Sequence, residues 1–158
     1  MFREMRRRNQ QVSNEECIEI LKNEKRAVLS LINEDGYPYG IPVDFYYDED
    51  NNKIYIHGAK EGSKIDSIKK DNRVCFTVYN QGFKKDNDWA WWSTSVIVFG
   101  KAELINDPTI TEDKVRKLGL KYYPTKESVE EEIKHAINRV QVISISVEHM
   151  TGKLVHEQ

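Results

Sequence analysis

Short runs of β-branched, aromatic and other apolar residues recur six times along the chain. Runs of this length and composition, bounded by polar and glycine-containing turns, are typical of β-strands. The predicted strands cover residues 26–32, 37–48, 53–58, 73–79, 93–105 and 140–150. The first three are joined by the short turns 33–36 and 49–52, so they are expected to form an antiparallel meander.

Four further segments show apolar residues at helical spacing: 13–25, 63–71, 110–123 and 125–137. The first begins with Ser13 and Glu16, which form a capping-box pattern, and the last begins with the capping residue Thr125. Six strands, with one helix after the third and two before the sixth, predict an α+β fold. We expect one domain over residues 1–158, built as a small, mainly antiparallel β-barrel that carries helices.

Composition narrows the range of partners. The chain has 24 Lys plus Arg against 26 Asp plus Glu, a net charge of -2, which argues against a nucleic-acid partner. Residues 1–12 form a basic arm containing Arg3, Arg6, Arg7 and Arg8, which is either mobile or folded over an anionic ligand.

No apolar run reaches the roughly 20 residues of a membrane span, and the start lacks a signal-peptide core. A cytoplasmic protein without a membrane partner is therefore expected.

The cysteines and histidines give no metal-binding pattern. Cys17 and Cys75 are isolated, and the four histidines form neither HxH nor HExxH, so no metal site is predicted. The signatures of serine hydrolases, P-loop proteins and Rossmann folds are also missing. These classes are not expected.

The segment NKIYIHGAKEGSKIDSI, residues 52–68, holds the clearest candidate site. A predicted strand ends at His57 and Gly58, and a helix starts at Ser63 and Lys64. A helix N-terminus presents unpaired N–H groups and the positive end of its dipole, so Ser63 and Lys64 there favour a phosphate site. The alternative for His57 and Lys64 is an ordinary solvated side chain.

Three tryptophans, Trp89, Trp91 and Trp92, lie within four residues of one another. Packing in a core or a dimer contact is one interpretation, because aromatic side chains dominate buried interfaces. The other is a planar ligand stacked on the indole rings.

Taken together, these residues resemble the FMN-binding split-barrel family typified by pyridoxamine 5'-phosphate oxidase, and within it the Nim-type nitroimidazole-resistance proteins. The resemblance is carried by MRRR, GYPYGIPVDF, IYIHGAKEGSKIDSIKKDNRVCFTV, SVIVFGKAEL and ISVEHMTGK. It implies a six-stranded antiparallel split barrel and a homodimer that holds FMN at its interface. In that arrangement a strand end lies along the flavin ring while the start of the helix binds the phosphate.

The same resemblance assigns individual positions. Along the flavin ring it places two strand segments, made of Ile41, Pro42, Val43 and Asp44 and of Ile56, His57 and Gly58. Ser63 and Lys64 correspond to the phosphate-binding pair. Ser95 corresponds to a polar residue that reaches across from the partner subunit, with Trp92 close by.

Several positions depart from the pattern of the vitamin B6 oxidases. Ile41 and Tyr46 stand where those enzymes have Arg and Lys, and Ser63 replaces a second basic residue. The sequence printed here ends without their C-terminal Trp and Arg segment. Oxidation of a B6 phosphate is therefore not expected. Ser93 and Thr94 also replace the aromatic residue that Nim-type proteins carry before SV.

The expected function is an FMN-dependent oxidoreductase that reduces a small, planar, electron-poor molecule of the nitroheterocycle or quinone type. His57 is the candidate catalytic residue, as substrate anchor or proton donor. One alternative is a module that stores FMN or senses redox state without turnover. Another is a structural dimer without flavin. Deazaflavin and heme remain alternative cofactors for a barrel of this kind.

Overall fold

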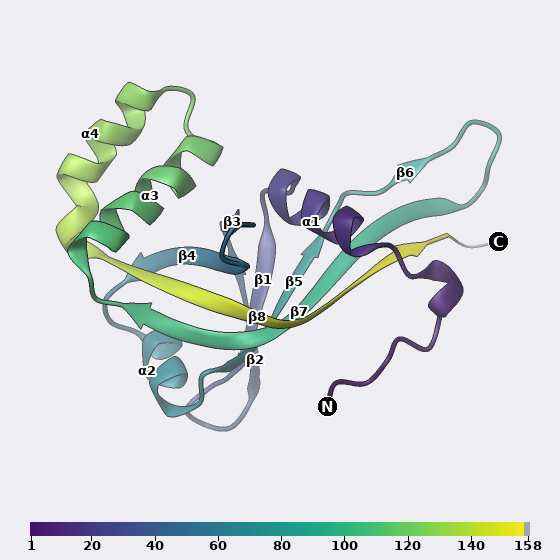
Figure 1. Ribbon diagram of the computed structural model, residues 1–158, viewed down its shortest axis with the longest axis horizontal. Coiled ribbons are helices and arrows are strands. Elements are labelled where there is room, and N and C mark those ends of the chain that lie inside the picture. The colour runs from purple at the N-terminus through teal and green to yellow at the C-terminus, as the bar shows by residue number, and fades with distance from the viewer. Residues whose placement is uncertain (157–158) are drawn as a thin grey trace.

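Eight strands, all paired antiparallel, form the sheet in the computed structural model, which describes residues 1–156 (Figure 1). The strands are β1 (Ala27–Ile32), β2 (Pro38–Val43), β3 (Tyr46–Asp48), β4 (Lys53–Ala59), β5 (Arg73–Tyr79), β6 (Phe83–Lys84), β7 (Trp91–Ile105) and β8 (Val140–Val155). The expected α+β class with an antiparallel sheet is confirmed. The number of strands is larger than the six predicted.

The extra strands have two origins. The segment predicted as one strand over residues 37–48 is divided, because Val43 pairs with Ala27 of β1 while Tyr46 pairs with Tyr55 of β4. The chain changes its neighbour between them, so residues 44–45 belong to neither ladder. β6 lies between the predicted strands 73–79 and 93–105, in a segment for which no strand was predicted, and its Phe83 pairs with Trp92.

The sheet curves into a barrel, but its two edge strands do not pair with each other. Its strand order is β2-β1-β5-β7-β8-β4-β3, with β6 paired to β7, so the two edge strands β2 and β3 are consecutive in the chain. Buried side chains from strands on both sides of this break share one core cluster. Phe45, fully buried at the break, packs edge-to-face on Phe76 of β5 with ring centroids 5.3 Å apart. The architecture is a split barrel.

The helices occupy the ends of the barrel. They are α1 (Asn14–Asn23), α2 (Ser63–Lys70), α3 (Pro108–Tyr122) and α4 (Lys126–Ala136), with short 3-10 turns at Arg8–Gln10 and Ile137–Arg139. The capping box of Ser13 and Glu16 is present, and Thr125 caps α4. Figure 1 shows α3 and α4 together beside the start of β8, opposite the β6–β7 hairpin. Of the helices in residues 1–156, none is long and apolar enough to cross a membrane.

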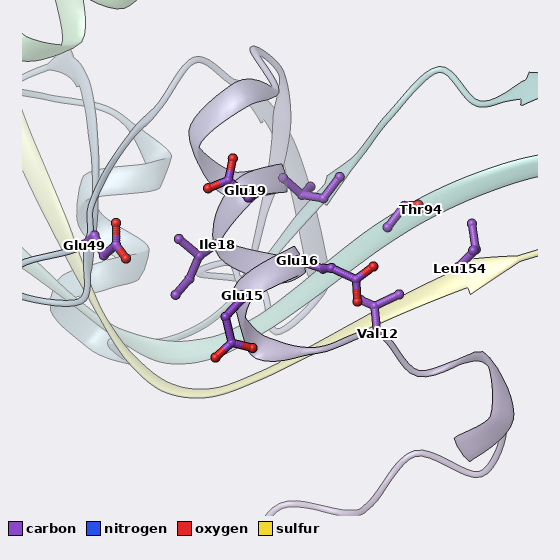
Figure 2. A pocket seen from close by; sticks show the side chains of 9 residues that line it. Val12, Glu15, Glu16, Ile18, Glu19, Glu49, Thr94 and Leu154 are labelled. Atoms are coloured by element: carbon purple, nitrogen blue, oxygen red, sulfur yellow. The ribbon is translucent and has the colours of Figure 1, made fainter.

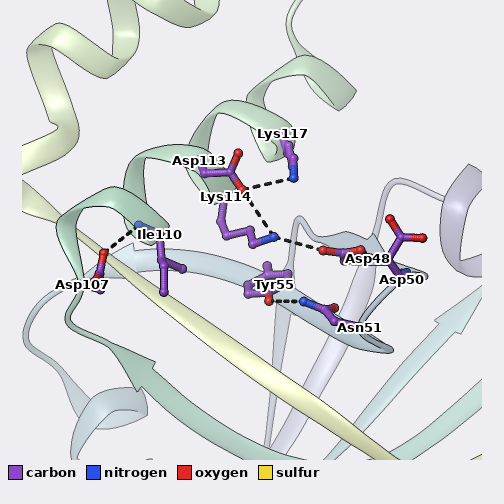
Figure 3. A network of polar contacts seen from close by, with 9 residues as sticks. All are labelled: Asp48, Asp50, Asn51, Tyr55, Asp107, Ile110, Asp113, Lys114 and Lys117. Atoms are coloured by element: carbon purple, nitrogen blue, oxygen red, sulfur yellow. Dashed lines mark hydrogen bonds and ion pairs between the residues drawn. The ribbon is translucent and has the colours of Figure 1, made fainter.

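A buried ion pair fixes α3 to the barrel (Figure 3). The Lys114 Nζ lies 3.0 Å from Asp48 Oδ2 on β3 and 4.7 Å from the centre of the Tyr55 ring on β4. The two charged side chains keep only 10% and 12% of their surface exposed. Because a buried charge without a partner is costly, this pair makes the position of α3 depend on β3 and β4.

We predict that Lys114→Met lowers the free energy of unfolding by about 3 kcal/mol, because Asp48 is left buried without its partner. Urea unfolding of the purified variant measures this change. The control is Lys117→Met one turn later, where the exposed lysine pairs with Asp113 and its loss changes stability by about 0.5 kcal/mol or less. A Lys114→Met variant as stable as this control would contradict the assignment.

Candidate functional site

The split in the barrel leaves one end of β4 without a neighbour on one side. β4 pairs with β8 over its whole length, from Lys53 opposite Ser146 to Ala59 opposite Val140. It pairs with β3 only between Lys53 and Tyr55. The backbone edge of residues 56–59 therefore faces no strand on the side of the split, and its polar groups are open to a ligand.

Two of the predicted residues, His57 and Asp44, lie on either side of this gap. His57 is on the free part of β4, and Asp44 is at the break after β2; both line one cavity. The Asp44 carboxylate is held by Arg26, with Nη1 2.6 Å from Oδ1. His57 is solvent-accessible on one side and shielded by the cavity wall on the other.

The pKa of His57 lies below its ordinary value of 6.5. Partial burial is the main cause, and the positive charge of Lys64 acts in the same direction, while Asp44 opposes both. The imidazole is consequently neutral at pH 7. In that form it can both donate and accept a hydrogen bond.

Lys64 folds back from the start of α2 onto the end of β4. Its Nζ lies 2.8 Å from the position that a Cβ on Gly58 would occupy, so the lysine uses the space left by this glycine. Partial burial lowers the pKa of Lys64. Within residues 1–156, no carboxylate lies at ion-pair distance from its ammonium group.

The backbone at the start of α2 adds to this positive region. The first bond within the helix runs from the Asp66 N–H to the Gly62 carbonyl, so the N–H groups of residues 63–65 precede it. Gly62 has φ 133°, which a residue with a side chain rarely adopts. Ser63 is exposed at the first helical position. The predicted pair of Ser63 and Lys64 thus lies at a helix N-terminus.

The side chains of the other predicted strand residues point in different directions relative to the split. Val43 and Ile56 point into the core, and Ile41 packs against it. Pro42 is exposed on the opposite face of β2. In this chain their side chains belong to the barrel wall, so a ligand in the gap would meet mainly their backbone.

Ser95 and Trp92 lie far from these residues within one chain. Gly58 of β4 pairs with Gln141 at the start of β8, whereas Ser95 of β7 pairs with Lys153 near its end. These partners are twelve residues apart along β8, which corresponds to about 40 Å of extended strand. The Trp92 indole donates to Asp88 and stacks on His156, with ring centroids 4.3 Å apart. The predicted site residues therefore form two separate groups.

Tyr122 and Lys121, at the end of α3, were missed from the sequence. The Tyr122 hydroxyl accepts from the Phe45 N–H at 2.9 Å and lies 2.8 Å from the Lys25 carbonyl and 3.0 Å from that of Phe45. The Lys121 Nζ donates to the Phe45 carbonyl at 3.1 Å, and burial lowers its pKa to about 8. Phe45 is 77 positions away from Tyr122 in the sequence, so no local pattern connects the two residues. The only local indication that the end of α3 packs against the barrel was its pair of aromatic residues.

Two cavities differ in their relation to this site. One of about 230 Å³ lies between α3, α4 and the end of β4, and it includes His57 and Asp44. Another, of about 450 Å³, lies along α1 (Figure 2). It contains none of the predicted residues and is bordered by Glu15, Glu16, Glu19 and Glu49. Its carboxylates disfavour an anionic ligand.

These features define a split-barrel protein with a cationic helix start beside an unpaired strand edge. The chain belongs to the family described as pyridoxamine 5'-phosphate oxidase, whose model matches residues 13–154. The family predicted from the sequence motifs is thus confirmed. No curated protein sequence matches the chain significantly.

Solved structures of similar fold cover most of the chain. A candidate 5-nitroimidazole antibiotic resistance protein from Bacteroides thetaiotaomicron is 22% identical, with a TM-score of 0.77 over 92% of this chain and 87% of the other. A flavocytochrome from Azotobacter vinelandii is 21% identical, with a TM-score of 0.79 over 96% and 72%. An FAD-binding protein from Mycobacterium smegmatis is 17% identical, with a TM-score of 0.67 over 94% and 99%. At these identities the likeness concerns the fold.

Proposed function

We propose that the protein binds FMN at the split of the barrel and uses it to reduce a small, planar, electron-poor molecule. The observation that carries the proposal is Lys64, a partly buried ammonium group at a helix start with no carboxylate at ion-pair distance in the described residues. Flavin binding is also named for two of the similar structures, a flavocytochrome and an FAD-binding protein.

The residues at the split fit a flavin mononucleotide. Lys64 and the N–H groups at the start of α2 would hold its phosphate, because both are suited to an anion. The open backbone edge of residues 56–59 and the segment 41–44 would hold the ring. FMN has a single phosphate, which matches one lysine at one helix start.

We also propose that two chains form a homodimer through the outer face of the sheet. Cys75, Phe99 and His149 lie in one row across β5, β7 and β8. Phe99 is 40% exposed although Phe2 stacks against it, and Ile97 on the same face is 39% exposed. Beyond them, the β6–β7 hairpin exposes Trp89 and Trp91. An apolar surface of this extent is typical of an interface between proteins.

A second copy of the chain bound to this outer face would explain why the predicted site residues form two separate groups. In an isologous dimer, each chain can place its own Ser95 and Trp92 against the partner's split. A flavin bound there would touch both chains. Dimerisation and flavin binding would then be coupled, because anything that binds the dimer alone also stabilises it.

A flavin, once reduced, supplies the electrons for such a reaction. His57 faces the split with an imidazole that is neutral at pH 7, and it can anchor a polar substituent of the substrate. In its protonated form it can donate a proton to the reduced product. Oxidation of a B6 phosphate is not proposed, because Ile41 packs against the core where the B6 oxidases have an arginine.

Lys64→Ala should weaken FMN binding by about 1.5 to 3 kcal/mol, the contribution of a charge-assisted hydrogen bond. Titration of the flavin-free protein with FMN and with riboflavin measures this, since riboflavin lacks the phosphate. The control is Lys69→Ala in the exposed last turn of the same helix. Equal losses for FMN and riboflavin would show that Lys64 does not bind the phosphate.

The parent protein should sediment at twice the 18.5 kDa mass of one chain. Ile97→Asp places a charge in the proposed interface, so this variant should be monomeric and should lose most of its FMN affinity. Ile110→Asp is the matched control, because Ile110 is equally exposed on α3. A monomeric parent that binds FMN tightly would rule out the shared site.

His57→Ala should leave FMN affinity within about tenfold, or 1.4 kcal/mol, while slowing reduction of a nitro or quinone acceptor by about 100-fold. Stopped-flow mixing of photoreduced protein with acceptor measures this without a physiological donor. In the parent the rate should rise as the pH falls below the ordinary histidine pKa of 6.5, because the pKa of His57 is lowered and only the imidazolium donates a proton.

His57→Gln separates the two roles of this residue. Glutamine keeps a hydrogen bond but titrates no proton, so it should preserve acceptor affinity and abolish the rise in rate at low pH. Acceptor reduction as fast in His57→Ala as in the parent would show that His57 has neither role.

A further inference from the structure

The cavity between α3, α4 and the end of β4 opens directly onto the split. We propose that it binds the electron acceptor and that it selects a small, uncharged aromatic compound. This inference rests on the proposed flavin function, because the acceptor must lie beside the flavin. His57 and Asp44 border the cavity on the side of the split, and the two helices form its other walls.

The volume of the cavity limits the size of the acceptor. It measures about 230 Å³. A cavity of about 150 Å³ in another protein accommodates benzene, whereas drug-sized ligands occupy pockets of about 300 Å³ or more. One aromatic ring with one or two small substituents fits between these limits. Compounds of three or more fused rings exceed this volume and do not fit without displacing a wall.

The walls are apolar and firmly held. Leu118 of α3 and Ile133 of α4 are buried and face the cavity, and Ala136 and Val140 complete this side. Arg116 joins the two helices through two hydrogen bonds to the Glu130 carboxylate, at 2.5 and 3.2 Å. The Lys114–Asp48 pair fixes α3 to the barrel. A preformed apolar slot of this kind suits a flat ring.

The polar groups at the border favour a neutral ligand. Asp44 is already paired with Arg26. Glu132, whose side chain is exposed, lines the cavity, and within residues 1–156 no cation lies at ion-pair distance from its carboxylate. The neutral His57 offers a hydrogen bond without a charge. An anionic ring would meet the Glu132 carboxylate with no free cation inside the cavity, so it should bind more weakly than a neutral ring of the same shape.

Two isosteric probes test the charge preference with the holoprotein. 4-Nitrobenzamide and 4-nitrobenzoate have almost the same size, but the second is an anion. We expect the oxidised holoprotein to bind the amide about threefold to fivefold more tightly, measured by calorimetry, because the Glu132 carboxylate is exposed and partly screened by solvent. Glu132→Gln should reduce this ratio several-fold. Equal affinities of the parent for the two probes would overturn the proposed selectivity.

Two substitutions in the wall test the location. Ala136→Leu fills part of the cavity from α4, so the affinity for 4-nitrobenzamide should fall at least tenfold while the flavin spectrum stays unchanged. His135→Leu adds the same side chain at the neighbouring exposed position and should bind the probe like the parent. Ile137→Ala enlarges the cavity and should admit the three-ring probe 9-nitroanthracene, which the parent excludes.

The outcomes separate this inference from the proposed function. Unchanged binding of 4-nitrobenzamide by folded Ala136→Leu, with flavin bound, would place the acceptor elsewhere and leave the flavin function intact. If the parent binds no flavin, the proposed function fails, and calorimetry on the flavin-free protein still decides whether the cavity takes the ring. If Ala136→Leu fails to fold, the result for Ile137→Ala decides: a variant that excludes 9-nitroanthracene would overturn the inference.

Discussion

The break at residues 44–45 is the constraint on which the rest of the structure depends. A strand that pairs with β1 on one side cannot also continue the ladder to β4, so the chain must leave one neighbour before it meets the next. The break costs backbone hydrogen bonds, and the Phe45 backbone recovers them from Tyr122 and Lys121. The same break leaves the end of β4 without a partner strand on one side. The loss of backbone hydrogen bonds at residues 44–45 and the open strand edge at residues 56–59 therefore have the same cause.

Local patterns were enough to predict the four long helices, the class of fold and most of the strand residues, but not β6. The capping box at Ser13, the cap at Thr125 and the helix start at Ser63 depend on residues close in sequence, and each lies where it was expected. The division of the second predicted strand was missed, because GIPVDFYYD is uniformly suited to a strand. Only its pairing with two different neighbours divides it, and pairing is not encoded within the segment.

The candidate site shows the same limit. His57, Gly58, Ser63 and Lys64 lie in one short segment, so sequence alone could bring them together. Asp44 reaches His57 only through the closure of the barrel, and Tyr122 reaches Phe45 across 77 positions. Ser95 and Trp92 remain distant within one chain because the long β7–β8 ladder separates them. In the proposed dimer a second chain would bring the two groups together, and the sequence indicated that arrangement only through its resemblance to a known family.

The two helices between β7 and β8 have different effects on the site. α3 both holds the break closed, through Tyr122 and Lys121, and walls the cavity, through Leu118. A change in α3 therefore affects the barrel and the cavity together. Ala136 of α4 borders the same cavity, whereas the hydrogen bonds that hold the β2–β3 connection come from Tyr122 and Lys121 of α3. If the cavity binds the acceptor as proposed, a substitution at Ala136 would alter which acceptor fits while leaving these hydrogen bonds in place.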